Sequence, residues 1–330
     1  MSKEYKDFFT NAPNKQVRKH NLEYFNNPDF ENKDINEVTS LLLDSYKTCN
    51  GRRFVNDDDI NCIFPSDKVE LERSTLSHLL NKHQWKGNFR SPIKEKLNTS
   101  GATILDIGCG PGLWAIDMGL EYPSSSIIGI DIDSSNFPSS DQCPSNVCFL
   151  ACNAIHGIPF PQNTFDFIHM SMMWGAFTED QWIVVIKDLV RVLNHDGWIE
   201  FTEPETTYRN CGKIQLLLYD SFMKATQKIR GVRLDIHKML PKYIEAIDEL
   251  EDLNCIIVDY PIGEWYGCFG KYSLENLKRL YQTVFFLPKY MKLSNEEFNN
   301  LLNDYVKEAN ENKACFGIFK CFARKVSKKF

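Results

Sequence analysis

This sequence of 330 residues lacks several features, and each absence excludes a class of protein. No apolar run reaches 18 residues, which excludes a membrane-spanning helix. Glycine and proline are ordinary in number, 17 and 14 residues, and 43% of the residues are hydrophobic, which excludes a disordered or collagen-like chain. The net charge of −6 gives no general attraction for nucleic acid or for an acidic membrane surface. We therefore expect a globular protein with a large hydrophobic core.

Three catalytic or metal-binding patterns are also missing. The sequence has no C-x-x-C pair and no H-x-x-x-H spacing, so nothing in it indicates a metal site. No G-x-S-x-G elbow occurs, which argues against a serine hydrolase. Because these patterns are absent, we next consider a site for a bound organic cofactor.

The cysteines predict a reducing compartment. Their number, eleven, is odd, and several lie inside apolar runs, as Cys255 and Cys321 do, where cysteine acts as a small hydrophobic residue. The first fifteen residues lack the apolar core of a secretory signal. We expect a cytoplasmic protein, with the nucleus as an alternative, and we interpret the basic end Arg324, Lys325, Lys328 and Lys329 as a solvated tail.

From residue 102 onward, short apolar segments alternate with helical ones, which is typical of a parallel sheet covered by helices on both faces. Capping boxes formed by Thr178 with Gln181 and by Ser294 with Glu297 mark the starts of two helices. The first of these helices is predicted at 179–193, with the turn 194–197 ending it. Strands are predicted at 102–108, 126–131, 146–151, 165–170, 197–202, 255–260 and 314–323.

The N-terminal part of the sequence lacks this alternation of short strands and helices. Residues 1–40 contain seven asparagines and few apolar residues, so we expect them to wrap the surface or to be partly mobile. A helix is predicted over 66–83, capped by Ser66, with Val69, Arg73, Leu76 and Leu80 on one stripe. The arginine on that stripe has two interpretations: it pairs with Glu70 one turn earlier, or the helix leans over a ligand pocket.

A glycine loop follows the first predicted strand. Gly108, Gly110 and Gly112 in the segment ILDIGCGPG allow a ligand to approach the backbone closely, and a nucleotide-like cofactor is the default occupant. Asp131 ends the second strand, 23 residues after Gly108, where a carboxylate can accept hydrogen bonds from both hydroxyls of a ribose. A glycine turn that holds no ligand is the alternative interpretation.

The spacing of the loop separates two cofactors. A dinucleotide loop has the spacing G-x-G-x-x-G and directs N–H groups at a pyrophosphate. Here the spacing is G-x-G-x-G, Pro111 removes one N–H donor, and Asp106 places a carboxylate just before the loop. A cationic ligand without phosphate, such as S-adenosylmethionine, suits such a surface better, so a nicotinamide-dependent oxidoreductase is the weaker alternative.

The segments ILDIGCGPG, GIDID, NAIHGIPFPQNTFDFIHM and RVLNHDGWIEFTEPE resemble the motifs of class I S-adenosylmethionine-dependent methyltransferases. More narrowly, CGPGLWAIDMGLEYP, the upstream GRRF and FPSDKVELERSTLSHLL, and the closing FGIFKCFARK resemble the fungal LaeA-like methyltransferases connected with secondary metabolism. The resemblance implies a Rossmann-like class I methyltransferase fold of class α/β: a seven-stranded, mostly parallel sheet with helices on both faces and a helical N-terminal extension. We divide the chain into an extension, 1–95, partly mobile and then helical, that covers the cofactor site, and a methyltransferase domain, 96–330. Within that domain, 102–205 is the cofactor half, and 206–330 supplies substrate-side helices and completes the sheet.

The resemblance also implies roles for individual residues. Asp106 is expected near the methionyl amino group and Asp131 at the ribose, while Asp133 is better explained as the cap of the following turn. Asn153 and Ala154 match the position that contacts the adenine, with the amide side chain forming a hydrogen bond with the exocyclic amine. Trp114 fits the narrower group and has an equally good structural interpretation as a buried ring between helix and sheet. The predicted cofactor-binding residues are Asp106, Gly108, Cys109, Gly110, Gly112, Trp114, Asp131, Ile132, Asn153, Ala154 and Met170; His169 adjoins Met170 in the segment expected to flank the methionyl moiety.

The acceptor of the methyl group is expected beyond the carboxyl ends of the strands. An aromatic and acidic set follows these ends, which could hold a cationic or flat aromatic acceptor; the alternative is that the rings anchor loops. Glu203 is our candidate for an acceptor ligand or general base. The candidate substrate-binding residues are Trp174, Glu205, Tyr208, His237, Trp265 and Tyr266.

These observations favour a methyltransferase that uses S-adenosylmethionine, leaving S-adenosylhomocysteine, and acts on a small molecule by alignment and exclusion of water. The alternative is a regulatory protein that binds the cofactor and acts through protein partners, as members of the resembled group are described to do. We expect no nucleic acid and no membrane as partner, and the sequence does not indicate an oligomeric state.

Overall fold

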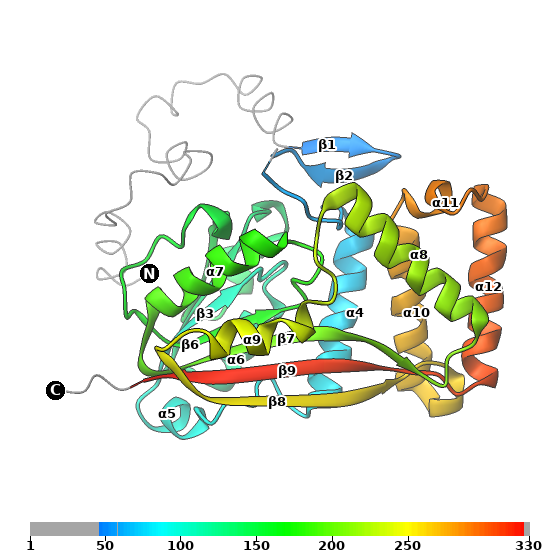
Figure 1. The fold of residues 1–330 in the computed structure, drawn as a ribbon. Coiled ribbons are helices and arrows are strands. Elements are labelled where there is room, and N and C mark those ends of the chain that lie inside the picture. The colour runs from blue at the N-terminus through cyan, green and yellow to red at the C-terminus, as the bar shows by residue number, and fades with distance from the viewer. Residues whose placement is uncertain (1–45, 58, 327–330) are drawn as a thin grey trace, which may run out of the picture.

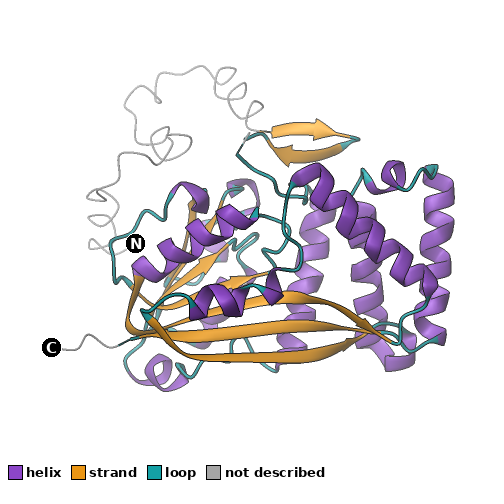
Figure 2. Cartoon of the chain, in the orientation of Figure 1, coloured by secondary structure: helices purple, strands orange, loops and turns teal. Residues whose placement is uncertain are grey.

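A seven-stranded mixed sheet forms the centre of the molecule (Figures 1 and 2). The computed structural model describes residues 46–57 and 59–326. The strand order is β5-β4-β3-β6-β7-β9-β8; the first five are parallel, and β9 is antiparallel to both of its neighbours. The strands are β3 (Thr103–Ile107), β4 (Ser126–Asp131), β5 (Val147–Ala151), β6 (Phe165–Ser171), β7 (Leu193–Arg209), β8 (Leu250–Pro261) and β9 (Cys315–Lys325). This is the fold that the sequence predicts.

Helices cover both faces of this sheet because alternate residues of the central strands are buried in opposite directions. Ile104 of β3 lies in a core cluster with Trp114 of α6, whereas the adjacent Leu105 belongs to the larger cluster on the other face, with Trp182 of α7. The capping boxes predicted at Thr178 and Ser294 are present and begin α7 and α12. The helices that follow α4 (Lys68–Trp85) are α5 (Lys94–Thr99), α6 (Leu113–Glu121), α7 (Glu179–Val192), α8 (Lys213–Arg230), α9 (Leu240–Glu245), α10 (Gly267–Thr283), α11 (Leu287–Tyr290) and α12 (Asn295–Glu311).

Strand β7 is much longer than predicted. It begins directly after α7 and runs for 17 residues, so the predicted turn 194–197 belongs to the strand, with Asp196 at a φ of 62°. Together β7, β8 and β9 extend past the parallel strands and end near α8, α10 and α12 at the right of Figure 1. This extension displaces the loops at that end of β7, β8 and β9 from the edge at which the shorter parallel strands end.

The N-terminal segment consists of the hairpin β1 (Tyr46–Cys49) and β2 (Arg52–Val55), a connecting stretch, and α4 (Lys68–Trp85). The predicted cap of α4 was wrong by one residue: Asp67 accepts from the backbone N–H of Glu70 at 3.1 Å. Val69 is 51% exposed rather than on the buried stripe. The buried face carries Arg73 and Leu80, as predicted, together with Glu70 and Trp85. The prediction for residues 1–40 falls outside the described residues.

Two predictions about surface and core residues need correction. Lys325 is not part of a solvated tail: it is 3% exposed, and its Nζ donates to the carbonyls of Val190 (2.7 Å) and Leu193 (3.0 Å). Cys321 is buried as expected, but Cys255 is exposed on the edge strand β8. All eleven cysteines are free thiols. None of the helices in residues 46–57 and 59–326 is long and apolar enough to cross a membrane.

Candidate functional site

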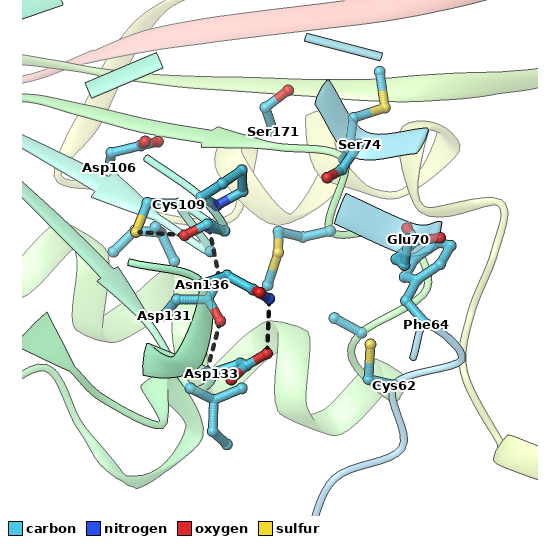
Figure 3. Close-up of a pocket in the computed structure, with 18 of the residues that line it drawn as sticks. Cys62, Phe64, Glu70, Ser74, Asp106, Cys109, Asp131, Asp133, Asn136 and Ser171 are labelled. Atoms are coloured by element: carbon cyan, nitrogen blue, oxygen red, sulfur yellow. Dashed lines mark hydrogen bonds between the residues drawn. The ribbon is translucent and has the colours of Figure 1, made fainter. Parts of the chain in front are cut away.

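A cavity of about 330 Å³ lies between the carboxyl ends of the parallel strands and the N-terminal segment. One wall is built by the loops after β3, β4, β5 and β6, and the opposite wall by β2, the stretch before α4, and α4 itself. Figure 3 shows residues of the two walls on opposite sides of the pocket: Asp106, Cys109 and Asp131 on one side, Cys62 and Glu70 on the other. The cavity therefore lies at the edge of the sheet at which ligands bind in open α/β folds.

The glycine loop belongs to the wall that the loops after the parallel strands build. Gly108, Gly110 and Gly112 all have positive φ values, 64°, 51° and 75°, which glycine adopts more readily than residues with a side chain. A Cβ on Gly110 would meet no atom within 4 Å, and its backbone N–H donates to Asp131 Oδ2 at 2.8 Å. A Cβ on Gly112 would collide with the ring of Phe149, so Gly112 serves packing at the start of α6 and does not line the cavity.

Asp131 is oriented by the backbone around it. Its Oδ2 accepts from Gly110 N, and its Oδ1 accepts from Asp133 N at 2.9 Å, which leaves each oxygen a further acceptor position. Burial raises the pKa of Asp131 to about 6, and the nearby carboxylates of Asp133 and Asp106 add to that rise. Asp133 caps the short 3₁₀ helix Ser134–Asn136, as predicted, through its contact with Ser135 N at 3.0 Å.

Asp106 forms a buried pair with His169. Because β3 and β6 place the two residues in register, His169 Nδ1 lies 2.8 Å from Asp106 Oδ1, and both side chains are at most 5% exposed. Burial raises the pKa of Asp106 to about 8 and, aided by the positive charge of Lys320, lowers the pKa of His169 to about 3. His169 is therefore a neutral ring, and its Nδ1 shares a hydrogen bond with the Asp106 carboxyl group. Sequence reasoning missed this contact because it depends on strand register.

Trp114 fixes the orientation of that imidazole. Its ring stacks on His169 with the centroids 3.9 Å apart and the planes at 5°, and its Nε1–H donates to the backbone carbonyl of Asn88 at 2.8 Å. Trp114 thus lines the cavity and also fills the space between α6 and the sheet, so both interpretations of the sequence describe it.

The side chain of Asn153 is engaged in the turn that follows β5. Its Oδ1 accepts from Ile155 N at 3.2 Å and caps the 3₁₀ helix Ala154–His156. Its Nδ2 is buried and has no partner in the structure. The amide oxygen expected to accept from an exocyclic amine is thus engaged by the backbone of the same turn.

Nine of the predicted cofactor-binding residues line the cavity, and two do not. Met170 is fully buried within the sheet, and Gly112 packs against Phe149. The nine that line it are Asp106, Gly108, Cys109, Gly110, Trp114, Asp131, Ile132, Asn153 and Ala154.

Glu203 is not placed to act on an acceptor. It is fully buried, does not line the cavity, and accepts the backbone N–H groups of Met173 and Trp174, both at 3.0 Å. Burial raises its pKa to about 8. Its contacts hold the loop that follows β6, so its position is that of a structural residue.

The candidate substrate-binding residues also lie outside the cavity lining, because the long β7 and β8 carry several of them away. Glu205 pairs with Arg209 at 2.7 Å, and Trp265 donates to the carbonyl of Ile262 at 2.9 Å. His237 is buried against Phe319. The structure brings none of the set Trp174, Glu205, Tyr208, His237, Trp265 and Tyr266 to the cavity.

The N-terminal wall contains site residues that sequence reasoning did not assign. Cys62, Phe64, Glu70 and Ser74 line the cavity opposite the glycine loop (Figure 3). Arg73 pairs with Glu70, Nη2 to Oε1 at 2.6 Å, as predicted, and it also lines the cavity, as the second interpretation of this arginine requires. A charged residue on an otherwise apolar helical stripe was the signal in the sequence.

Comparison with known proteins identifies the family. The sequence model of a family described as "Methyltransferase domain" matches residues 81–240. The chain is 31% identical over 236 residues, 68% of either chain, to "Methyltransferase pytC" of Aspergillus terreus. This chain belongs to the methyltransferase family.

Other relatives of this methyltransferase are matched over shorter segments. They include "N-methyltransferase verN" of Clonostachys rogersoniana, 27% identical over 42% of this chain, and "Secondary metabolism regulator laeA" of Aspergillus niger, 30% identical over 49% of it. The alignments span 48% and 44% of those two proteins, about half of their length. The predicted resemblance to S-adenosylmethionine-dependent methyltransferases, and to fungal ones of secondary metabolism, is confirmed.

Solved structures similar to this methyltransferase share little sequence with it. One is the Haemonchus contortus phosphoethanolamine N-methyltransferase 2 in complex with S-adenosyl-L-methionine: 17% identity, TM-score 0.47, covering 79% of this chain and 59% of that one. Another is YcgJ of Bacillus subtilis, with 16% identity and a TM-score of 0.44, covering 71% of this chain and 98% of that one.

Proposed function

We propose that this methyltransferase takes the methyl group of S-adenosylmethionine and transfers it to a small molecule bound in the same cavity. The single observation that carries the cofactor assignment is the pair of buried carboxylates, Asp106 and Asp131, beside the glycine loop. Neither makes an ion pair with a lysine or arginine among the described residues, and burial raises the pKa of both. Such a site favours a positively charged ligand and disfavours a phosphate.

The donor set fits each part of this cofactor. Asp106 has one oxygen, Oδ2, available for an ammonium group, and Asp131 can accept from two ribose hydroxyls. Asn153 and Ala154 line the cavity after β5, where the adenine is expected. Gly110 leaves room for close approach to the backbone. When bound, the cofactor supplies a methyl carbon already activated by its sulfonium.

The protein's contribution is alignment and exclusion of water, because the activated methyl group needs no nucleophile from the protein. Hydrophobic side chains occupy much of the wall opposite the glycine loop and the loop after β6, among them Phe54, Ile60, Phe64, Ala176 and Phe177. This lining supports a compact, largely apolar acceptor. We assign no general base.

Binding measurements test the cofactor assignment directly. Isothermal titration with S-adenosylhomocysteine and, separately, with NAD should give saturable binding of the first alone. Binding of NAD without binding of S-adenosylhomocysteine would overturn the proposal and favour the oxidoreductase alternative. Incubation with methyl-labelled cofactor and a fungal metabolite extract should then label a small-molecule fraction.

A regulatory role is the second candidate, because relatives that include the Aspergillus niger protein are named secondary metabolism regulators. It predicts binding of S-adenosylhomocysteine without labelled small molecules, and capture of a defined protein partner. The same labelled incubation, repeated with the protein fraction of the extract, separates the two proposals.

The place of action we propose is the cytoplasm. Eleven free cysteines support a reducing compartment, since disulfides would be expected in an oxidising one. The net charge of −6 supports a small molecule or a protein, rather than nucleic acid, as the partner.

A further inference from the structure

Two cysteines lie opposite each other at the outer edge of the sheet. Cys255 of the edge strand β8 and Cys321 of β9 are register partners in an antiparallel pair, and this register continues without a break from Asn254 to Pro261. All eleven cysteines of the chain lie within the described residues as free thiols, and no other strand pairing there places two of them opposite each other. Strand register therefore favours a disulfide at this one pair.

The geometry of an antiparallel pair suits a disulfide. The Cα atoms of opposite residues lie about 4.5 or 5.5 Å apart, depending on whether the pair is hydrogen-bonded, and their side chains leave the sheet on the same face. Disulfides span Cα separations of about 4.4 to 6.8 Å. A hydrogen bond already joins the side chains of Cys255 and Cys321. Oxidation of the pair therefore needs no rearrangement of the two strands.

The two thiols differ in exposure and in acidity. Cys255 is exposed, whereas Cys321 is fully buried. The hydrogen bond from the Cys321 thiol lowers the pKa of Cys255, and it outweighs burial and the Glu245 carboxylate, which act in the opposite direction. Burial raises the pKa of Cys321 well above its ordinary value. Because the thiolate is the reactive form, Cys255 is the residue that reacts first with an oxidant.

We propose that Cys255 and Cys321 form an oxidative modification site, which hydroperoxides convert to a disulfide. The Cys255 sulfur attacks one peroxide oxygen, the O–O bond breaks, and the leaving oxygen takes a proton to give water or an alcohol. The product on Cys255 is a sulfenic acid. The Cys321 sulfur then attacks the sulfenic sulfur, and the Cys321 proton leaves with the hydroxyl group as water. Two thiols are oxidised by two electrons in total, and one hydroperoxide is reduced.

This site is separate from the cavity. Neither Cys255 nor Cys321 lines it, so the inference does not depend on the proposed function. The disulfide joins the edge strand to β9, whose Lys320 lines the cavity and pairs with the buried Glu200 at 2.6 Å. In a reducing compartment, disulfides are usually transient and respond to the redox state. The pair therefore gives the protein a reversible response to peroxide.

Treatment of the purified full-length protein with a stoichiometric amount of hydrogen peroxide tests the site. Thiols are counted under denaturing conditions, and peptides are mapped without reductant. The number of free thiols should fall by two from eleven, and the linked peptides should contain Cys255 and Cys321. Dithiothreitol should restore both thiols. An unchanged count, or a disulfide between other cysteines, would overturn the proposal.

Two variants separate the roles of the thiols. In Cys321→Ser, Cys255 should accumulate as a sulfenic acid that dimedone labels, because no opposite thiol converts it to a disulfide. In Cys255→Ser, Cys321 should stay reduced at the same dose of peroxide, because it is buried. The matched control is Cys268→Ser. Cys268 is also exposed but lies at the start of α10, with no cysteine opposite it, so this variant should still form the bond between Cys255 and Cys321.

Two further outcomes would contradict the proposal. A dimer on a non-reducing gel, linked through Cys255 of each copy of the chain, would show that Cys321 is not the thiol that resolves the sulfenic acid. Oxidation of Cys321 in Cys255→Ser would show that Cys255 is not the first thiol to react. Should Cys321→Ser fail to fold, the peptide map of the wild-type protein and the Cys255→Ser variant decide, since Cys255 is exposed.

Discussion

The hydroxyl of Tyr46 donates to Asp133 Oδ1 at 2.7 Å, and this bond joins the N-terminal hairpin to the loop after β4. Ser66 donates from its Oγ to the other oxygen, Oδ2, of the same carboxylate. Asp133 therefore ties two points of the N-terminal wall to the wall that carries Asp131. Closure of the cavity depends on these contacts between segments far apart in the sequence.

Tyr46→Phe should loosen this closure. Removing the hydroxyl deletes one hydrogen bond to a carboxylate in a part-buried setting, which is expected to lower the free energy of unfolding by about 1 kcal/mol. Urea denaturation measures this change, and binding of S-adenosylhomocysteine should weaken in parallel. The exposed Tyr272→Phe is the control, and equal stabilities of Tyr46→Phe and wild type would contradict the role of the bond.

Asp131→Ala should weaken binding of S-adenosylhomocysteine by about 1 to 3 kcal/mol, because the ribose hydroxyls would lose a buried acceptor. Calorimetric titration gives this difference directly. The matched control is Asp141→Ala, which removes an exposed carboxylate from the segment between β4 and β5 and should bind normally. An unchanged affinity of Asp131→Ala would remove this residue from the site.

The affinity for S-adenosylhomocysteine should rise with pH between about 6 and 7.5. Burial raises the pKa of Asp106 to about 8 from an ordinary value of 3.8, so in the free protein this carboxyl is largely protonated in that range. Binding of an ammonium group favours the ionised form, and each step toward pH 8 lowers the cost of ionisation. Titrations at several pH values test the rise, which Asp106→Asn should flatten; an identical pH profile in that variant would contradict the assignment.

The same shift has a consequence for stability. Because the pKa of Asp106 is higher in the folded than in the unfolded chain, the folded state binds more protons between pH 4 and 8. The contribution of Asp106 to the free energy of unfolding is therefore complete below pH 4 and is lost as the pH rises through 8. Urea titrations across this range should show a shallower decline in Asp106→Asn than in wild type.

Glu203→Gln should affect stability more than ligand binding. The carboxylate accepts two backbone N–H groups of the loop after β6 and does not line the cavity. An amide oxygen can replace only part of this interaction, so we expect a loss of about 1 to 2 kcal/mol in urea denaturation. Labelling of small molecules, measured below the unfolding transition, should persist. Loss of labelling in a stably folded variant would restore Glu203 as a candidate base.

The local features of the fold could be predicted from the sequence because each depends on residues close together in the chain. Apolar runs marked all seven strands of the central sheet, with β4 recovered at its observed bounds, and the boxes at Thr178 and Ser294 gave the starts of two helices. The glycine loop and Asp131 formed a recognisable pattern for the same reason. Where a local feature such as a helix cap was predicted wrongly, the error was small: the cap of α4 is Asp67 rather than Ser66.

The site beyond the glycine loop could not be predicted, because it depends on which distant segments meet. The pairing of Asp106 with His169 follows from the register of β3 and β6. Trp265 and Tyr266 follow β8, which ends away from the cavity. Their position directly after a predicted strand therefore suggested a place at the cavity that the structure does not give them.

The sequence by itself determined the succession of strands and helices along the chain, the cofactor loop and the family, since hydrophobic periodicity, caps and glycine conformations act over a few residues. Only the tertiary structure decided that α4 closes the cavity, that Glu203 holds a loop, and that Lys320 lies buried beside Trp85. Strand order, strand length and the burial of charge depend on the whole core, and no short stretch of sequence contains them.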